Sequence, residues 1–212
     1  MHAELTQGQI HAGVRLAREV YREIDEQDID FWGIAQKYKS NCLGYGCFSV
    51  VMVHPELEHV AVKISVAPQD GGVLYAYWAR DNQDLRGVPE IYHIEQISSS
   101  VTVIIMKRYH STVAQHPNYE IAPDITADRI RYHLSRQFHD GKAFKYAHEF
   151  TQAITSEDLG KIEAYFTTVR AIAKFFRGRV DFDLHDENIM LDEVNNELII
   201  IDPLSFVGGQ KI

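Results

Sequence analysis

The chain has 212 residues, of which 45% are hydrophobic and 24% are charged, a composition typical of a folded globular protein rather than a disordered one. With 21 lysines and arginines against 30 aspartates and glutamates, the formal net charge is −9. This acidic excess disfavours direct binding to nucleic acid, because that binding depends on clustered cations. It favours, at most, basic protein partners.

Nothing in the sequence indicates a membrane segment or a disulfide framework. No stretch reaches the roughly 18 apolar residues that a membrane span needs. Cys42 and Cys47 lie five positions apart beside glycines, which is typical of free thiols in a reducing compartment. We therefore expect a soluble cytoplasmic protein with no membrane partner.

Residues 1–40 are predicted to form a helical extension. Apolar residues recur every three or four positions in residues 6–24, which indicates an amphipathic helix with Thr6 as its cap. A shorter helical pattern follows at residues 29–38, after an acidic run that is typical of a solvated turn. We expect these helices to brace the lobe that follows.

Residues 41–109 change to patterns rich in β-branched residues, and we expect a small lobe of strands around one helix. The predicted strands cover residues 48–53, 59–66, 88–97 and 101–106, and the predicted helix covers residues 73–82.

Residues 110–212 are predicted to form a second, mostly helical lobe. Residues 107–124 are polar and contain prolines, which is typical of a linker and crossover. Helical patterns follow at residues 127–138, 142–154 and 157–177, and strand patterns at residues 188–191 and 198–201.

A glycine turn between two strands is the first of three pieces that carry chemistry. Gly44 and Gly46 are followed by a strand rather than a helix, which argues against a dinucleotide-binding fingerprint. Without Cβ atoms, their backbone N–H groups can approach phosphates, although a plain β-turn would also use glycine.

The second piece is Lys63, which interrupts the otherwise apolar strand at residues 60–64. A lysine there can extend along the strand to reach solvent. A phosphate-binding turn directly upstream gives its ammonium group an anionic partner, and this favours a functional role.

The third piece is a set of oxygen ligands near the end of the chain. Asp183 and Asn188 lie five positions apart, and Asp202 closes an apolar strand that follows them. Carboxylate and carboxamide oxygens suit Mg²⁺, which is commonly shared with substrate phosphates. Asp202 alone would be read as a turn residue.

These three pieces, in this order, resemble the protein kinase superfamily over residues 41–206. By this resemblance Asp183 is the catalytic base that accepts the substrate hydroxyl proton, and Asn188 and Asp202 bind Mg²⁺. Lys63 holds the α- and β-phosphates of ATP, and His185 approaches the γ-phosphate. The residues implied to surround the nucleotide are Gly44, Tyr45, Gly46, Cys47, Phe48, Ser49, Val51, Ala61, Lys63 and Met106.

A closer similarity is to the early serine/threonine protein kinase of T-seven-like bacteriophages. It rests on residues 43–49 (LGYGCFS), 87–92 (GVPEIY), 174–176 (KFF), 182–185 (FDLH), 187–190 (ENIM) and 201–206 (IDPLSF). This similarity implies phosphorylation of host transcription and translation proteins on Ser or Thr early in infection, and a part in host shut-off. Ser205, three residues beyond Asp202, is the candidate autophosphorylation site, with a plain turn serine as the alternative.

The sequence also departs from the wider kinase pattern. His185 stands where most kinases have lysine, as in kinases of the aminoglycoside type. The predicted helix at residues 73–82 has no glutamate to pair with Lys63. The candidate partners are Asp70, Asp81 and Asp84, and the sequence does not choose among them.

Only ten residues follow Asp202, so we expect a compact, C-terminally truncated, bilobal α+β fold of the protein kinase type. The substrate platform would then come from residues 121–177 or from a second copy in a homo-oligomer. Two alternatives to a protein kinase stay open. One is a small-molecule kinase, and the other is a non-catalytic acidic or pseudokinase protein that inhibits a host factor.

Overall fold

The computed structural model describes residues 5–24, 29–67, 70–111, 156–176, 180–182, 188–195 and 197–205. The chain forms two compact units. Met1–Gln83 and Pro89–Tyr109 make the first, and Asp84–Val88 and His110–Ile212 make the second. Helices and an antiparallel sheet confirm the predicted α+β class. Within the described ranges, no helix is long and apolar enough to cross a membrane.

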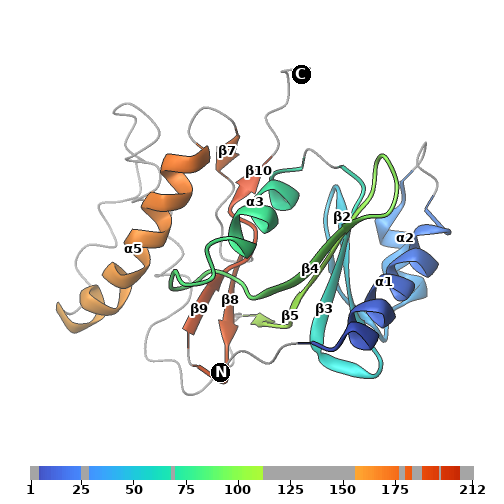
Figure 1. Ribbon diagram of the computed structural model, residues 1–212, viewed down its shortest axis with the longest axis horizontal. Coiled ribbons are helices and arrows are strands. Elements are labelled where there is room, and N and C mark those ends of the chain that lie inside the picture. Colours follow the sequence, from blue (N-terminus) through green and yellow to red (C-terminus); the bar gives the residue numbers. More distant parts are fainter. Residues whose placement is uncertain are drawn as a thin grey trace. The chain divides into compact units, whose positions relative to one another are not determined.

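The first unit is built on a five-stranded antiparallel sheet with the order β1-β2-β3-β5-β4 (Figure 1). Its strands are β1 (Cys42–Tyr45), β2 (Ser49–His54), β3 (Leu57–Ser65), β4 (Ile91–Gln96) and β5 (Thr102–Lys107). The enrichment in β-branched residues predicted β2, β3 and β5 to within a few residues. The central strand β3 pairs along its length with β2 and β5, which fixes the direction of every side chain on it.

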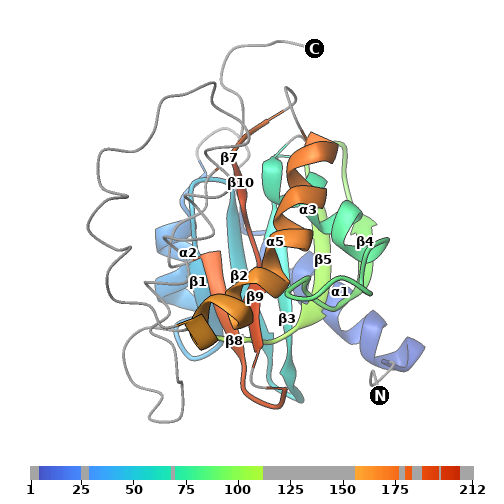
Figure 2. The same ribbon diagram turned by 90° about the vertical axis from the view of Figure 1, so that its left-hand side faces the viewer.

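Two helices cover one face of this sheet, while α3 (Gly71–Arg80) lies on the other side against β4 and β5 (Figures 1 and 2). The longer covering helix, α1 (Gln7–Tyr21), begins at Thr6 with the predicted cap. The Thr6 side chain accepts from the Gln9 backbone N–H, and the Gln9 side chain accepts from the Thr6 backbone N–H. The shorter covering helix is α2 (Phe31–Lys37).

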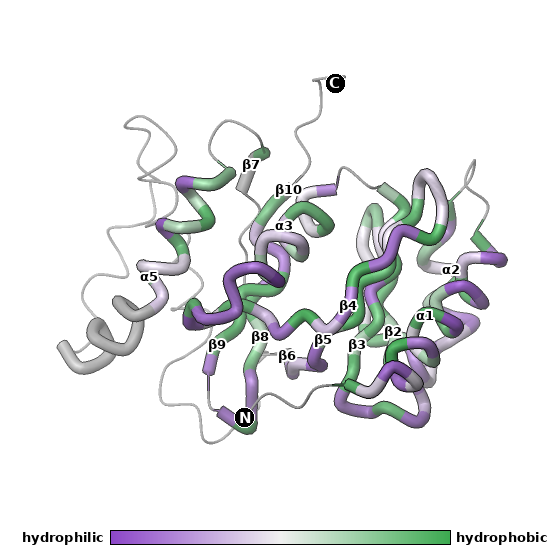
Figure 3. Tube along the Cα trace, in the orientation of Figure 1, coloured by the Kyte–Doolittle hydropathy of each residue, from purple (hydrophilic) through white to green (hydrophobic). Residues whose placement is uncertain are grey.

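The core of the first unit lies between α1, α2 and the sheet. Buried residues of α1 pack on those strand residues that point to the same side, and Figure 3 shows hydrophobic residues along β3 and β5. The main members are Ile10, Val14, Ala17, Val20, Ile34, Val50, Met52, Val60, Val62, Ile64, Val103 and Ile105.

A hydrogen bond also joins the residues that follow α1 and α2. The Tyr38 hydroxyl donates to the carboxylate of Glu23 at 2.7 Å. This hydrogen bond raises the pKa of Tyr38 to about 12.

The described residues of the second unit form one long helix and two small antiparallel sheets. The helix is α5 (Ser156–Phe176), which confirms the pattern predicted at residues 157–177. The sheets are β6-β8-β9 and β10-β7, with β6 (His110–Ser111), β7 (Asp181–Phe182), β8 (Ile189–Asp192), β9 (Glu197–Ile200) and β10 (Leu204–Ser205). In the turn between β8 and β9, Asp192 accepts hydrogen bonds from the backbone N–H of Val194 and from the side chain of Asn195.

A short segment between α3 and β4 belongs to the second unit. The Thr168 hydroxyl donates a hydrogen bond to the carbonyl oxygen of Arg86 at 2.6 Å. The backbone N–H of Ile200 donates to the carbonyl oxygen of Gly87 at 2.8 Å. Gly87 has a φ of +78°, and a Cβ there would lie 2.7 Å from the ring of Tyr165. Only glycine satisfies both conditions without strain.

Two predictions at this segment and its neighbourhood were wrong. The strand expected at residues 88–97 begins only at Ile91, because Val88 belongs to the segment that is part of the second unit. Part of the linker expected at residues 107–124 is strand, because His110 and Ser111 pair with Leu191 and Met190. The helices predicted at residues 127–138 and 142–154 lie outside the described residues.

Candidate active site

The glycine turn connects β1 to β2 in the first unit. Its backbone is held by a hydrogen bond from the N–H of Gly46 to the carbonyl oxygen of Ser49, at 2.8 Å. Gly87 is the described glycine with a positive φ, so Gly44 and Gly46 do not serve a left-handed turn. No described atom lies within 4 Å of a Cβ placed at either one. Packing within the described residues therefore does not require glycine at either position, and the open space leaves room for a ligand to approach the backbone.

Large side chains of the turn face solvent. Tyr45 is 52% exposed and Phe48 is 44% exposed, and Cys47 is an exposed free thiol. Cys42 is also free, and burial raises the pKa of its thiol. An open glycine turn with exposed aromatic residues is a suitable cover for a bound ligand.

Lys63 lies on the central strand β3 and is only 7% exposed. It is paired with Val51 on β2 and with Ile104 on β5. Residues directly opposite one another share a face of the sheet, as do residues two apart on one strand. Because Val62 and Ile64 pack toward α1, Lys63 points to the opposite face.

The same face carries three more of the residues predicted to surround a nucleotide. Val51 is directly opposite Lys63, Ala61 lies two residues before Lys63, and Met106 is directly opposite Ala61. The sheet register thus brings together Val51, Ala61, Lys63 and Met106, which come from three strands. Three are apolar and one is cationic, a combination that suits an aromatic base with a phosphate group.

In the second unit, the structure brings Asn188 close to Asp202. The N–H of Ile201 donates to the carbonyl oxygen of Asn188 at 2.9 Å, and Ile189 pairs with Ile200. Asn188 and Asp202 therefore lie at the same end of the β8–β9 hairpin, and both are partly exposed. Their carboxamide and carboxylate oxygens fit the ligand preference of Mg²⁺, with further positions left to water and phosphate.

The strands on either side of the predicted catalytic loop are also paired. Phe182 pairs with Leu204, and Asp181 pairs with Ser205. This pairing holds the residues just before Asp183 beside the residues just after Asp202. Asp183 and His185 themselves lie outside the described residues.

Two strands of this site were not predicted. β7 and β10 each have two residues, too few for a hydrophobic period, and they exist because they pair with each other. The apolar residues Phe182 and Leu204, one residue before Asp183 and two residues after Asp202, were the available signal.

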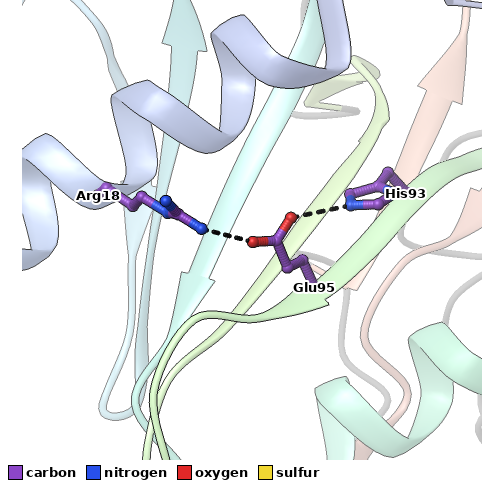
Figure 4. A network of polar contacts seen from close by, with 3 residues as sticks. All are labelled: Arg18, His93 and Glu95. Carbon is purple, nitrogen blue, oxygen red and sulfur yellow. Dashed lines mark hydrogen bonds and ion pairs between the residues drawn. The ribbon is translucent and has the colours of Figure 1, made fainter. Parts of the chain in front are cut away.

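A polar network in the first unit lies outside the predicted site (Figure 4). Arg18 of α1 donates to Glu95 of β4 at 2.8 Å, and His93 Nε2 lies 3.3 Å from the second carboxylate oxygen of Glu95. Burial disfavours the charged carboxylate, but the contacts with His93 and Arg18 outweigh it and lower the pKa of Glu95. The network links α1 to the edge of the sheet.

A five-stranded antiparallel sheet with a buried lysine on its central strand and a helix on the lysine side is compatible with the small lobe of a protein kinase. A family model described as bacteriophage T7 protein kinase 0.7 matches residues 23–211. The chain therefore belongs to this family of bacteriophage protein kinases, as the sequence predicted. A comparison with curated proteins finds no match. The matched segment includes every predicted site residue and begins after α1.

Proposed function

We propose that the chain is an ATP- and Mg²⁺-dependent serine/threonine protein kinase that phosphorylates host proteins in the bacterial cytoplasm during infection. The observation that carries this proposal is the register of the first unit's sheet, which gathers Val51, Ala61, Lys63 and Met106 on one face. In this proposal the two units are the small and large lobes of a bilobal kinase.

The first unit would bind the nucleotide. Its adenine would lie against Val51, Ala61 and Met106, and the ammonium group of Lys63 would hold the α- and β-phosphates. The open Cβ positions at Gly44 and Gly46 support an approach of backbone N–H groups to the phosphates. Tyr45, Cys47, Phe48 and Ser49 would complete the cover.

The second unit would supply the groups for transfer. Asn188 and Asp202 would hold Mg²⁺, which when bound neutralises charge on the phosphates. Asp183 would accept the proton of the substrate hydroxyl, and His185 would donate toward the γ-phosphate. The pairing of β7 with β10 supports this arrangement, because it fixes the chain just before Asp183 beside the chain just after Asp202.

The net charge supports a class of substrate. A net charge of −9 favours basic proteins, such as those of host transcription and translation, and their modification would contribute to host shut-off. Ser205 lies in β10, three residues after Asp202, and is the proposed autophosphorylation site. A second copy of the chain would complete the substrate surface.

The decisive experiment replaces the proposed base, Asp183→Asn, and measures transfer from labelled ATP to host proteins and to a panel of small alcohols. We expect transfer to host proteins to be lost while thermal unfolding and ATP binding stay close to wild type. Wild-type transfer to small alcohols alone would instead identify a small-molecule kinase. Full host shut-off by the Asp183→Asn variant would identify a non-catalytic inhibitor. Mass spectrometry after incubation with Mg-ATP tests Ser205 directly.

A further inference from the structure

Asp70 stands at the start of α3 but does not cap it. An aspartate at this position ordinarily accepts a hydrogen bond from a backbone N–H of the first turn. The Asp70 side chain makes no such bond. Its carboxylate oxygen Oδ2 instead lies 3.4 Å from the hydroxyl of Ser65, which donates to it. The carboxylate is therefore directed toward β3 and away from its own helix.

Ser65 and Lys63 lie on the same face of β3. They are two residues apart in a regular strand, and they pair with Thr102 and Ile104 on β5. Side chains two residues apart on a strand are separated by about 7 Å, a distance that the four-carbon stem of lysine can span. A carboxylate in contact with Ser65 is therefore within the range of Lys63.

Charge and burial point to the same pairing. Asp70 is 8% exposed, Ser65 is fully buried and Lys63 is 7% exposed. Burying a charged group costs free energy unless an opposite charge compensates it. Among the described residues of the first unit, Lys63 is the buried cation and Asp70 is the buried acid, and both belong to the same side of β3.

The other two candidates for this role are less suitable. Asp81 follows the last residue of α3, about 16 Å along the helix from Asp70. It is exposed and pairs with Arg80 at 3.3 Å. Asp84 is exposed and belongs to the second unit.

We propose that Asp70 is the positioning residue that pairs with Lys63 and holds its ammonium group ready for the nucleotide phosphates. This inference rests on the proposed kinase function only for the role of Lys63 toward phosphate. The pair spans seven residues and is anchored through Ser65 on the same strand. The hydrogen bond from Ser65 keeps the Asp70 carboxylate close to β3.

A double-mutant cycle on stability tests the pairing itself. Asp70→Asn and Lys63→Met should each lower the melting temperature, because each leaves one buried charge uncompensated. The double variant should melt well above the temperature that additive losses would give. Strictly additive losses would overturn the proposal. This measurement needs no kinase activity, so it is unaffected if the proposed function fails.

Nucleotide kinetics then test the positioning role. Asp70→Asn should reduce kcat/KM for ATP by up to about 100-fold, Asp70→Glu should restore part of the loss, and the loss should be absent in a Lys63→Met background. Asp81→Asn, on the same helix but exposed, is the matched control and should behave as wild type. A loss for Lys63→Met with wild-type kinetics for Asp70→Asn would refute the role of Asp70. Wild-type ATP binding by Lys63→Met would refute the nucleotide site itself.

Discussion

Asn188 accepts a hydrogen bond of 2.9 Å from the backbone N–H of Ile201. Residues far apart in the sequence are thereby fixed at one end of the β8–β9 hairpin, and Asp202 is the next residue along the chain. Backbone pairing thus places two residues with oxygen-bearing side chains at the same end of the hairpin.

Replacing Asp202 by asparagine should remove the charged ligand while keeping this backbone bond. We expect Asp202→Asn to lower phosphoryl transfer by at least about 100-fold and to shift the Mg²⁺ dependence to higher concentration. Circular dichroism and thermal unfolding should stay near wild type. Glu193→Gln, an exposed change near the opposite end of the same hairpin, is the control. Unchanged Mg²⁺ dependence in Asp202→Asn would contradict the assignment.

Gly46→Ala separates a ligand-binding role from a structural one. The surrounding space is open and φ is not positive, so the substitution should leave the melting temperature unchanged. If phosphates approach this turn, the added methyl group should weaken ATP binding by about threefold to tenfold. Titration with a fluorescent ATP analogue measures the affinity for the nucleotide, and Gly8→Ala in α1 is the control. Equal affinities in all three proteins would argue for a plain β-turn.

Gly87→Ala should destabilise the second unit. The residue has a φ of +78°, and the new Cβ would lie 2.7 Å from Cδ1 of Tyr165 and 3.1 Å from the carbonyl oxygen of Leu198. Backbone strain and overpacking together should cost about 2–4 kcal/mol. Urea unfolding measures the free energy, and Gly46→Ala serves as the comparison. A wild-type midpoint for Gly87→Ala would show that the ring and backbone can relax.

Glu95→Gln should reveal the electrostatic link between α1 and β4. The pKa of Glu95 is lowered in the folded protein. Its carboxylate therefore contributes stability that is fully present above the unfolded-state pKa and is lost as the pH falls through the lower folded-state pKa. At pH 7 the variant should be less stable than the wild type by only about 0.5 kcal/mol. The loss is small because Arg18, the partner of Glu95, is largely exposed to solvent. The difference should shrink as the pH falls through the lowered folded-state pKa of Glu95, as measured by thermal unfolding at several pH values. A difference that is constant from pH 7 to pH 3 would mean that the carboxylate charge has no part in it.

Local patterns were sufficient for much of the first unit. The apolar repeat and Thr6 predicted α1 with its cap, and the enrichment in β-branched residues predicted β2 and β3. Lys63 could be found because a charged residue interrupts an apolar strand. In each case the signal lies within a few neighbouring residues, which is the range over which periodicity acts.

Features that depend on distant partners could not be found in this way. β7 and β10 are strands only because Phe182 meets Leu204. The three aspartates that could serve Lys63 look alike in sequence, and they differ in burial and in contacts, which the folded chain decides. Asp70 is distinguished by its contact with Ser65 and by the absence of a bond to its own helix.

The segment Asp84–Val88 limits how the chain can be divided into separately expressed fragments. The chain enters the second unit at Asp84, returns to the first at Pro89 and re-enters the second at His110. A fragment that starts at His110 would lack the carbonyl groups that accept hydrogen bonds from Thr168 and Ile200. A fragment that ends at Tyr109 would carry those groups without their donors. Expression of the halves as separate pieces should therefore fail unless the two pieces are produced together and reassociate around these five residues.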